Sequence, residues 1–236
     1  EPLINRLPFS RMPVTTAATR RVNFSERSVD PLPCVLVFDP EPSSPVVVGK
    51  SKGQYSESTD PGYEAFKTAN ETRKKMVYVG SNDGMLHAFD EATGTEVWAY
   101  VPSTAYSSEP DKGLAMLAKN GAFFKHQMFV DSTPVAVDVK IGGAWKTLLI
   151  GGVGKGGKGY YAIDITSPAG ITSEADAAAK VLWEFTDADM GYTFGKPLIG
   201  KTYADNTWVA ILPAGYNNAS GKGKLFFVRL SDGKLL

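Results

Sequence analysis

The sequence contains very little cysteine or histidine. Its 236 residues include one cysteine, Cys34, and two histidines, His87 and His126. A single cysteine excludes a disulfide framework within the chain. Neither histidine belongs to an H-x-E or H-E-x-x-H pattern or accompanies a second ligand type, so the sequence predicts no metal site and no catalytic residue. A Ser-His-Asp triad depends on neighbours in space and stays open at this point, although no G-x-S-x-G motif supports it.

Neither sign of charge is in excess, and long apolar runs are missing. Lysine and arginine number 25, as do aspartate and glutamate, so the formal net charge is zero. This balance argues against a protein that binds nucleic acid or an anionic membrane surface through a general basic field. No apolar run approaches the ~18 residues of a membrane span, so the sequence predicts no transmembrane segment.

Glycine and proline are abundant and divide the chain into short segments. There are 24 glycines and 15 prolines, which favours many strands joined by turns and disfavours a helical bundle. Eight of the prolines lie within residues 1–45. Because proline removes a backbone donor and restricts the residue before it, we expect residues 1–44 to be irregular, with one strand over 34–38.

Short apolar runs bounded by glycine recur three times in the rest of the chain. Each unit reads as strand, glycine-containing turn, strand, Thr-Gly or Asp-Gly turn, and strand. One more candidate strand precedes each unit, over 45–49, 129–139 and 196–202. Four antiparallel strands per unit predict the blades of an all-β, quinoprotein-like β-propeller. The predicted domain is 45–236, with blades at about 45–103, 129–187 and 196–236, the last incomplete.

Insertions between these strands carry the expected helices. Helical patterns cover 63–73, 114–119 and 173–180, and Ser173 and Asp176 have the spacing of a capping box. The insertions 50–75, 103–128 and 166–180 are candidate binding loops, because rigid scaffolds present their functional residues on loops. Propellers close with about 4–8 blades, so we expect this chain to be part of a longer protein.

Several of these segments resemble the signatures of a known family. Residues 77–90 (VYVGSNDGMLHAFD), 151–164 (GGVGKGGKGYYAID) and 182–187 (LWEFTD) are similar to motifs of the PilC/PilY family of type IV pilus-biogenesis factors and tip adhesins. The longest match is 189–197 (DMGYTFGKP), which is followed by 215–218 (GYNN). The residues that carry the motifs are Gly80, Asp83, Gly84, Asp90, Gly94, Trp98, Gly152, Asp164, Trp183, Gly195, Pro197 and Gly215.

The resemblance implies a C-terminal β-propeller of an exported protein at the pilus tip, cell surface or periplasm of a Gram-negative bacterium. It implies a non-enzymatic role in pilus assembly, twitching motility and adhesion, with minor pilins and host or abiotic surfaces as partners. Family members also bind calcium in a loop of alternating acids, which lies beyond the part of the family that this chain matches. The nearest acidic pair, Asp187 and Asp189, has no such continuation, so we expect no cofactor or metal in this chain.

The individual motif residues favour structural roles. Asn and Asp before glycine suit a tight hairpin turn at Asp83-Gly84. Asp90 and Asp164 follow strands, where a carboxylate accepts backbone N–H bonds. Trp98 and Trp183 are expected to pack between blades. Sugar stacking by Trp145 or Trp208 is the less favoured alternative for the remaining tryptophans.

Two enzymatic interpretations compete with this one. Residues 152–157 fit G-x-G-x-x-G by letter, but a dinucleotide site needs a helix after the glycines, and 160–165 has a strand pattern. The second is a dehydrogenase that binds pyrroloquinoline quinone with calcium, because the propeller repeat of those enzymes resembles this one. A vicinal cysteine pair, common in one branch of them, is absent from this sequence.

Overall fold

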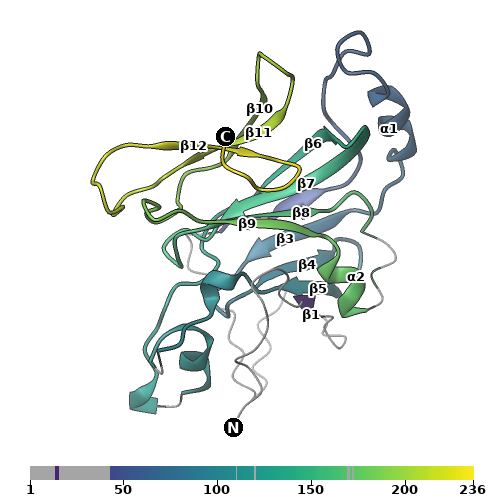
Figure 1. The fold of residues 1–236 in the computed structure, drawn as a ribbon. Helices are drawn as coiled ribbons and strands as arrows, with labels where there is room; N and C mark the ends of the chain where they lie inside the picture. The colour runs from purple at the N-terminus through teal and green to yellow at the C-terminus, as the bar shows by residue number, and fades with distance from the viewer. Residues whose placement is uncertain (1–13, 16–42, 110, 120, 169–170, 172) are drawn as a thin grey trace.

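Three antiparallel β-sheets pack face to face (Figure 1). A computed structural model describes residues 14–15, 43–109, 111–119, 121–168, 171 and 173–236. The first sheet has the strand order β1-β5-β4-β3-β2, the second β6-β7-β8-β9, and the third β10-β11-β12. The strand expected over 34–38 lies outside the described residues. The all-β architecture predicted from the sequence is confirmed.

The strands have the following bounds: β1 Val14–Thr15, β2 Val46–Val48, β3 Met76–Gly80, β4 Leu86–Asp90, β5 Glu96–Tyr100, β6 Val135–Ile141, β7 Ala144–Gly152, β8 Tyr160–Asp164, β9 Val181–Phe185, β10 Leu198–Lys201, β11 Trp208–Pro213 and β12 Leu225–Arg229. The helices and 3₁₀ turns are α1 Tyr63–Ala69, η2 Ser103–Ala105, η3 Gly113–Ala118, η4 Gly121–Phe123 and α2 Glu174–Ala178. The Ser173 hydroxyl caps α2 by accepting the Asp176 N–H, as its spacing predicts.

The first two sheets repeat one another at the level of single residues. Ala88 of β4 lies opposite Trp98 of β5, and Ala162 of β8 lies opposite Trp183 of β9. In both sheets the register shifts directly after the alanine. The sequence repeat is therefore also a structural repeat, and the register shift between the last two strands is part of it.

The core consists of two apolar layers on either side of the second sheet. Successive strand residues point to opposite faces, so Leu149 and Tyr161 contact the first sheet while Leu148 and Tyr160 contact the third. Burial of both faces explains why the centre of β7, residues 148–150, is a continuous apolar run instead of an alternating one. The outer face of the third sheet, by contrast, exposes Leu198, Leu225 and Phe227.

Three expected elements differ from the structure. The strand expected over 129–139 begins only at Val135, because residues 129–131 bond to neighbouring turns instead of to β7. The helix expected over 63–73 ends at Ala69, and the chain after it turns so that Arg73 reaches Gly49 and Thr147. Within segment 1–44, for which the sequence predicted one strand over 34–38, the described residues Val14–Thr15 form β1, which pairs antiparallel with β5.

The third sheet has three strands among the described residues. Its β11 ends at Pro213, as expected of proline in a central strand. After the turn at Asp232-Gly233, Leu235 forms an isolated antiparallel bridge to Val228.

Candidate functional site

The glycine-containing turns of the family-like motifs lie at one end of the three sheets, whereas Asp90, Gly94 and Asp164 lie at the other. Because antiparallel strands alternate in direction, the connections 81–85, 153–159 and 214–224 leave from the same end as the inter-sheet links 101–134 and 186–197. We call this end the motif face. The insertions 50–75 and 166–180 leave from the opposite end, as Figure 1 shows for α1 and α2.

The first inter-sheet link passes between two turns of the motif face. The Val130 N–H donates to the Ser81 carbonyl at 3.3 Å, and the Asp131 N–H donates to the Val153 carbonyl at 3.2 Å. The Phe129 N–H donates to the Asn82 side-chain oxygen at 3.2 Å. Backbone hydrogen bonds thus join the first sheet to the second at this end.

The second link repeats this arrangement around Thr193, which is fully buried. Its N–H donates to the Gly154 carbonyl at 3.2 Å. Its hydroxyl accepts the Val153 N–H at 2.9 Å and donates to the Gly159 carbonyl at 3.0 Å. One residue further back, the Tyr192 N–H donates to the Tyr216 carbonyl at 2.9 Å. A continuous backbone network therefore connects all three sheets across the motif face.

The glycines of the motifs allow this close approach. A Cβ atom at Gly80 would lie 2.3 Å from the Val130 carbonyl oxygen, and one at Gly152 would lie 2.4 Å from the Thr193 carbonyl oxygen. At Gly215 the corresponding distance to the Tyr192 carbonyl oxygen is 1.8 Å. Real Cβ atoms do not come this close, so each of these positions excludes a side chain.

The end of the second link is held by side-chain packing. A Cβ atom at Gly195 would lie 2.7 Å from the Pro213 ring, and Pro197 is buried directly before β10.

The glycine-rich segment 152–159 joins β7 to β8, so a strand follows it and not a helix. The helix N-terminus that a dinucleotide site requires is therefore missing at this motif, as the sequence pattern predicted.

The Asp83-Gly84 turn holds a buried histidine. Asp83 accepts the Met85 N–H through Oδ1, and its Oδ2 lies 2.9 Å from Nε2 of His87. The other ring nitrogen of His87 lies 2.6 Å from Oε1 of Glu96 on β5. Burial opposes the charged imidazolium, but the hydrogen bonds to the two carboxylates outweigh it and raise the pKa of His87 to about 9.

Asp90 and Asp164 terminate equivalent strands with equivalent contacts. The Asp90 carboxylate accepts the Ala92 N–H at 2.9 Å, and the Asp164 carboxylate accepts the Thr166 N–H at 3.0 Å. Lysines at 2.7 Å and 2.6 Å neutralise the two carboxylates. The hydrogen bond from Lys74 lowers the pKa of Asp90, and Gly94 completes its turn with a positive φ of 66°. At both sites the carboxylate therefore makes the backbone contacts of a turn-stabilising residue.

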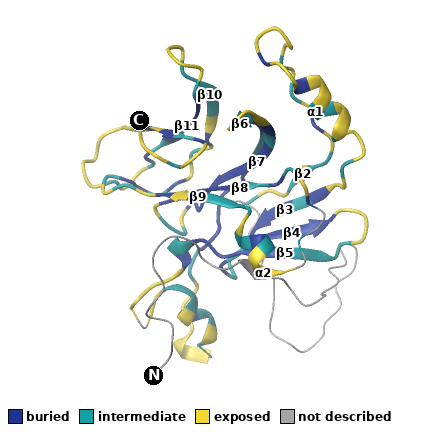
Figure 2. Cartoon of the chain, turned by 45° about the vertical axis from the view of Figure 1, so that its right-hand side comes forward, coloured by how far each residue is buried: buried dark blue, intermediate teal, exposed yellow. Residues whose placement is uncertain are grey.

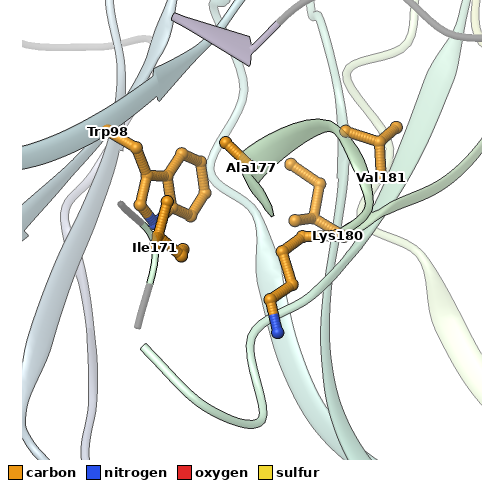
Figure 3. A pocket seen from close by; sticks show the side chains of 6 residues that line it. Trp98, Ile171, Ala177, Lys180 and Val181 are labelled. Atoms are coloured by element: carbon orange, nitrogen blue, oxygen red, sulfur yellow. The ribbon is translucent and has the colours of Figure 1, made fainter. Parts of the chain in front are cut away.

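The two equivalent tryptophans differ in hydrogen bonding. Nε1 of Trp183 donates to the Leu230 carbonyl of the third sheet at 2.9 Å. Trp98 is also buried, but its Nε1 has no hydrogen-bond partner among the described residues. Trp98 lines a small pocket beside α2 (Figure 3). The other residues that line this pocket are Ile163, Ile171, Ala177, Lys180 and Val181.

Sequence reasoning missed an aromatic cluster that insertion 50–75 forms with the other sheets. Tyr55 and Tyr63 pack against Trp145 at centroid distances of 5.0 and 4.6 Å, and Tyr55 also packs edge-on against Trp208. Both tryptophans are buried in this cluster, which leaves no open face for a sugar. The aromatic residues of 50–75 were visible in the sequence, but their partners are distant along the chain.

Comparisons with known proteins agree with this geometry. A protein-family model described as the PilY1 beta-propeller domain matches residues 39–234. The chain belongs to the PilY1 family. It is 37% identical to the type IV pilus biogenesis factor PilY1 of Pseudomonas aeruginosa, over 99% of this chain and 20% of that protein. A PilY1 homolog of Xylella fastidiosa is also 37% identical, over 80% of this chain and 13% of the homolog.

A solved structure gives the same fold. The crystal structure of the P. aeruginosa PilY1 C-terminal domain matches with a TM-score of 0.62 and 33% identity, over 80% of this chain and 35% of that one. The three sheets are therefore blades of a PilY1-type β-propeller. The chain spans about a fifth of the length of the first curated relative. In the part of the chain that the structure describes, no helix is long and apolar enough to cross a membrane.

Proposed function

We propose that this chain is a scaffold within an exported type IV pilus biogenesis factor, and that it acts by binding other proteins and not by catalysis. The observation that carries the proposal is the network across the motif face. Three glycines of the family-like motifs, Gly80, Gly152 and Gly215, lie in close backbone contacts between blades, beside the inter-blade hydrogen bonds of the two links. The names of the relatives add the biological setting, since they are called pilus biogenesis factors.

The partners that follow from this setting are pilus subunits, in particular the minor pilins, with adhesion to a host or abiotic surface as a further role. A rigid stack of blades leaves recognition to the loops on its two ends. We place the protein at the pilus tip or on the cell surface, where such contacts occur.

The acidic pair at the second link does not fit a calcium site. Oδ2 of Asp189 lies 2.7 Å from Nζ of Lys224, and its Oδ1 accepts the Ser220 N–H at 2.8 Å. The hydrogen bond from Lys224 is the largest of the contacts that lower the pKa of Asp189, to about 2. An ammonium group holds the position that a cation would need, so we place any calcium site of the full-length protein outside these residues.

A genetic experiment tests the pilus role. We expect deletion of the gene in the source bacterium to reduce surface pili, and the full-length wild-type gene to restore them. Gly152→Asp, which breaks the network at the second link, should fail to restore piliation, whereas Gly200→Ala should restore it because no atom lies near that position. Normal piliation of the deletion strain would refute the proposal.

A spectroscopic experiment tests whether the protein binds the quinone cofactor that the dehydrogenase alternative requires. The purified protein is mixed with pyrroloquinoline quinone and calcium, and the bound cofactor is measured by its absorbance after gel filtration. We expect no retained absorbance. Stoichiometric retention would replace the scaffold proposal with the dehydrogenase alternative.

A further inference from the structure

The inter-sheet link of the first blade carries an arm, residues 103–128, that stands apart from the sheets (Figure 1). It contains η2, η3 and η4 and begins and ends at the motif face. Its tip exposes two adjacent aromatic side chains: Phe123 is 77% exposed and Phe124 43%. Figure 2 shows exposed residues along much of this arm. Exposed aromatic residues that adjoin one another are a feature of binding surfaces.

The arm is held in shape by its own contacts. Met116 is buried inside it, and the Lys125 N–H donates to the Met116 sulfur at 3.3 Å. The side-chain oxygen of Gln127 accepts the Gly113 N–H at 3.1 Å, and its amide donates to the Asp111 carbonyl at 3.0 Å. A loop that is packed by its own side chains presents its tip with little further loss of entropy on binding.

The base of the arm is seated on the first blade. Leu114 and Leu117 pack against a small apolar cluster that contains Val101 and Phe129, at the two ends of the arm. Leu114 also lies over the Asp83-Gly84 turn, where a Cβ atom at Gly84 would meet it at 2.3 Å. Leu114 and Leu117 of η3 therefore face the body of the protein, whereas Phe123 and Phe124 are exposed.

The arm holds three lysines and two acids, and the acids Glu109 and Asp111 both precede its basic second half. Residues 112–130 contain Lys112, Lys119, Lys125 and His126 and no aspartate or glutamate. Lys112 and Lys119 pair with acids that precede this stretch. Among the described residues, Lys125 has no ion pair, and it directly follows the two phenylalanines. The tip thus combines aromatic anchors with an unneutralised positive charge.

We infer that the Phe123-Phe124-Lys125 tip is a docking anchor for an apolar pocket with an acidic rim on another protein of the pilus. This inference rests on the proposed function, which supplies the class of partner. Aromatic side chains at the centre of an interface carry a large share of its binding energy, and a matching opposite charge guides the approach. A membrane fits less well, because interfacial binding uses an amphipathic helix, whereas here η3 turns its apolar residues inward.

Site-specific crosslinking tests the inference in the full-length protein. Phe123→p-benzoylphenylalanine is expressed in piliated cells and irradiated, and the adducts are identified by mass spectrometry. Tyr203→p-benzoylphenylalanine is the matched control, since Tyr203 is fully exposed in the β10–β11 turn at the opposite end of the sheets. We expect adducts with a pilus protein from position 123 and not from position 203. Adducts only within the same chain, only with lipid, or equally from both positions would overturn the inference.

Affinity for pili provides a second readout. We expect Phe123→Ser with Phe124→Ser to reduce co-sedimentation of the full-length protein with sheared pili at least tenfold. Lys125→Glu should reduce it less, and the effect of this charge change should shrink as salt is raised. Tyr203→Ser should bind as wild type. Unchanged binding of the double variant overturns the docking inference and leaves the proposed function intact, whereas wild-type protein that does not sediment with pili refutes the proposed function itself.

Discussion

His87 shows how a single residue links turn, strand and charge at the residue scale. Its pKa is raised from 6.5 to about 9 because Asp83 and Glu96 hold the imidazolium in a buried position. A folded-state pKa above the unfolded value stabilises the fold fully below pH 6.5, and the contribution is lost as pH rises through 9. The size of this contribution is on the order of 3 kcal/mol.

We therefore expect the free energy of unfolding to fall between pH 6.5 and 9.5, and His87→Gln to remove most of this fall. Urea unfolding at a series of pH values measures it. The control is His126→Gln, because His126 is exposed on the arm and should leave the profile as in the wild type. A pH profile that is the same for wild type and His87→Gln would show that the buried cluster contributes nothing.

Gly152 tests the close backbone approach at the second link. Gly152→Ala places a methyl group 2.4 Å from the Thr193 carbonyl oxygen, so we expect a loss of about 2–3 kcal/mol in stability. Gly200→Ala on β10 meets no atom within 4 Å and should change stability by less than about 1 kcal/mol. Equal thermal unfolding curves for the two variants would contradict the role given to the motif glycines.

The two inter-blade tryptophans form a natural pair for mutation. Trp183→Phe removes the donor to the buried Leu230 carbonyl, whereas Trp98→Phe removes an N–H that has no partner. Both variants lose similar packing, so Trp183→Phe should cost about 1 kcal/mol more in chemical denaturation. If Trp98→Phe proves the more damaging substitution, the hydrogen bond is not what distinguishes the two sites.

At the scale of elements, insertion 50–75 ties the first blade to the other two. The Tyr63 hydroxyl donates to the buried carboxylate of Asp138 on β6 at 2.7 Å. Asp60 and Lys201 form an ion pair, which joins the insertion to the third blade. The insertion is therefore an internal brace as well as a surface loop.

Loss of the Tyr63 hydroxyl tests this brace. Tyr63→Phe leaves a buried carboxylate with one hydrogen-bond donor fewer, so we expect a loss of about 1–3 kcal/mol in the free energy of unfolding. Tyr203→Phe alters an exposed ring and should stay within about 0.5 kcal/mol of wild type. Calorimetry measures the thermal unfolding of both variants. Equal melting temperatures would show that the brace does not stabilise the fold.

The sequence predicted the repeated elements well, because their signals are local. Short apolar runs bounded by glycine placed the strand over 45–49 within a residue of β2, and the strand over 196–202 within two residues of β10. The same reasoning extended β6 too far towards 129, since the bonds that residues 129–131 make to neighbouring turns depend on the fold. The aromatic cluster around Trp145 and the charged state of His87 were missed for the same reason: Tyr55 lies in a distant insertion, and Glu96 lies on the neighbouring strand β5.

At the scale of the whole molecule, the three blades form a scaffold with two distinct ends. One end carries the backbone network and the arm, and the other carries the brace and α2. Resemblance to a family was needed to connect this architecture to pili, because the blade pattern itself is shared by proteins of different function. The outer face of the third blade exposes Leu198, Leu225 and Phe227, as expected of a surface that other residues cover in a longer protein.

The most direct test of the central claim is the location of the native protein. An antibody raised against this chain is used to probe the sheared-pilus, envelope and soluble fractions of the source cells. The account predicts a band well above 25.4 kDa in the pilus or envelope fraction, since the chain spans a fifth of a curated relative. A band confined to the soluble cytosolic fraction would contradict a role for this propeller in the type IV pilus.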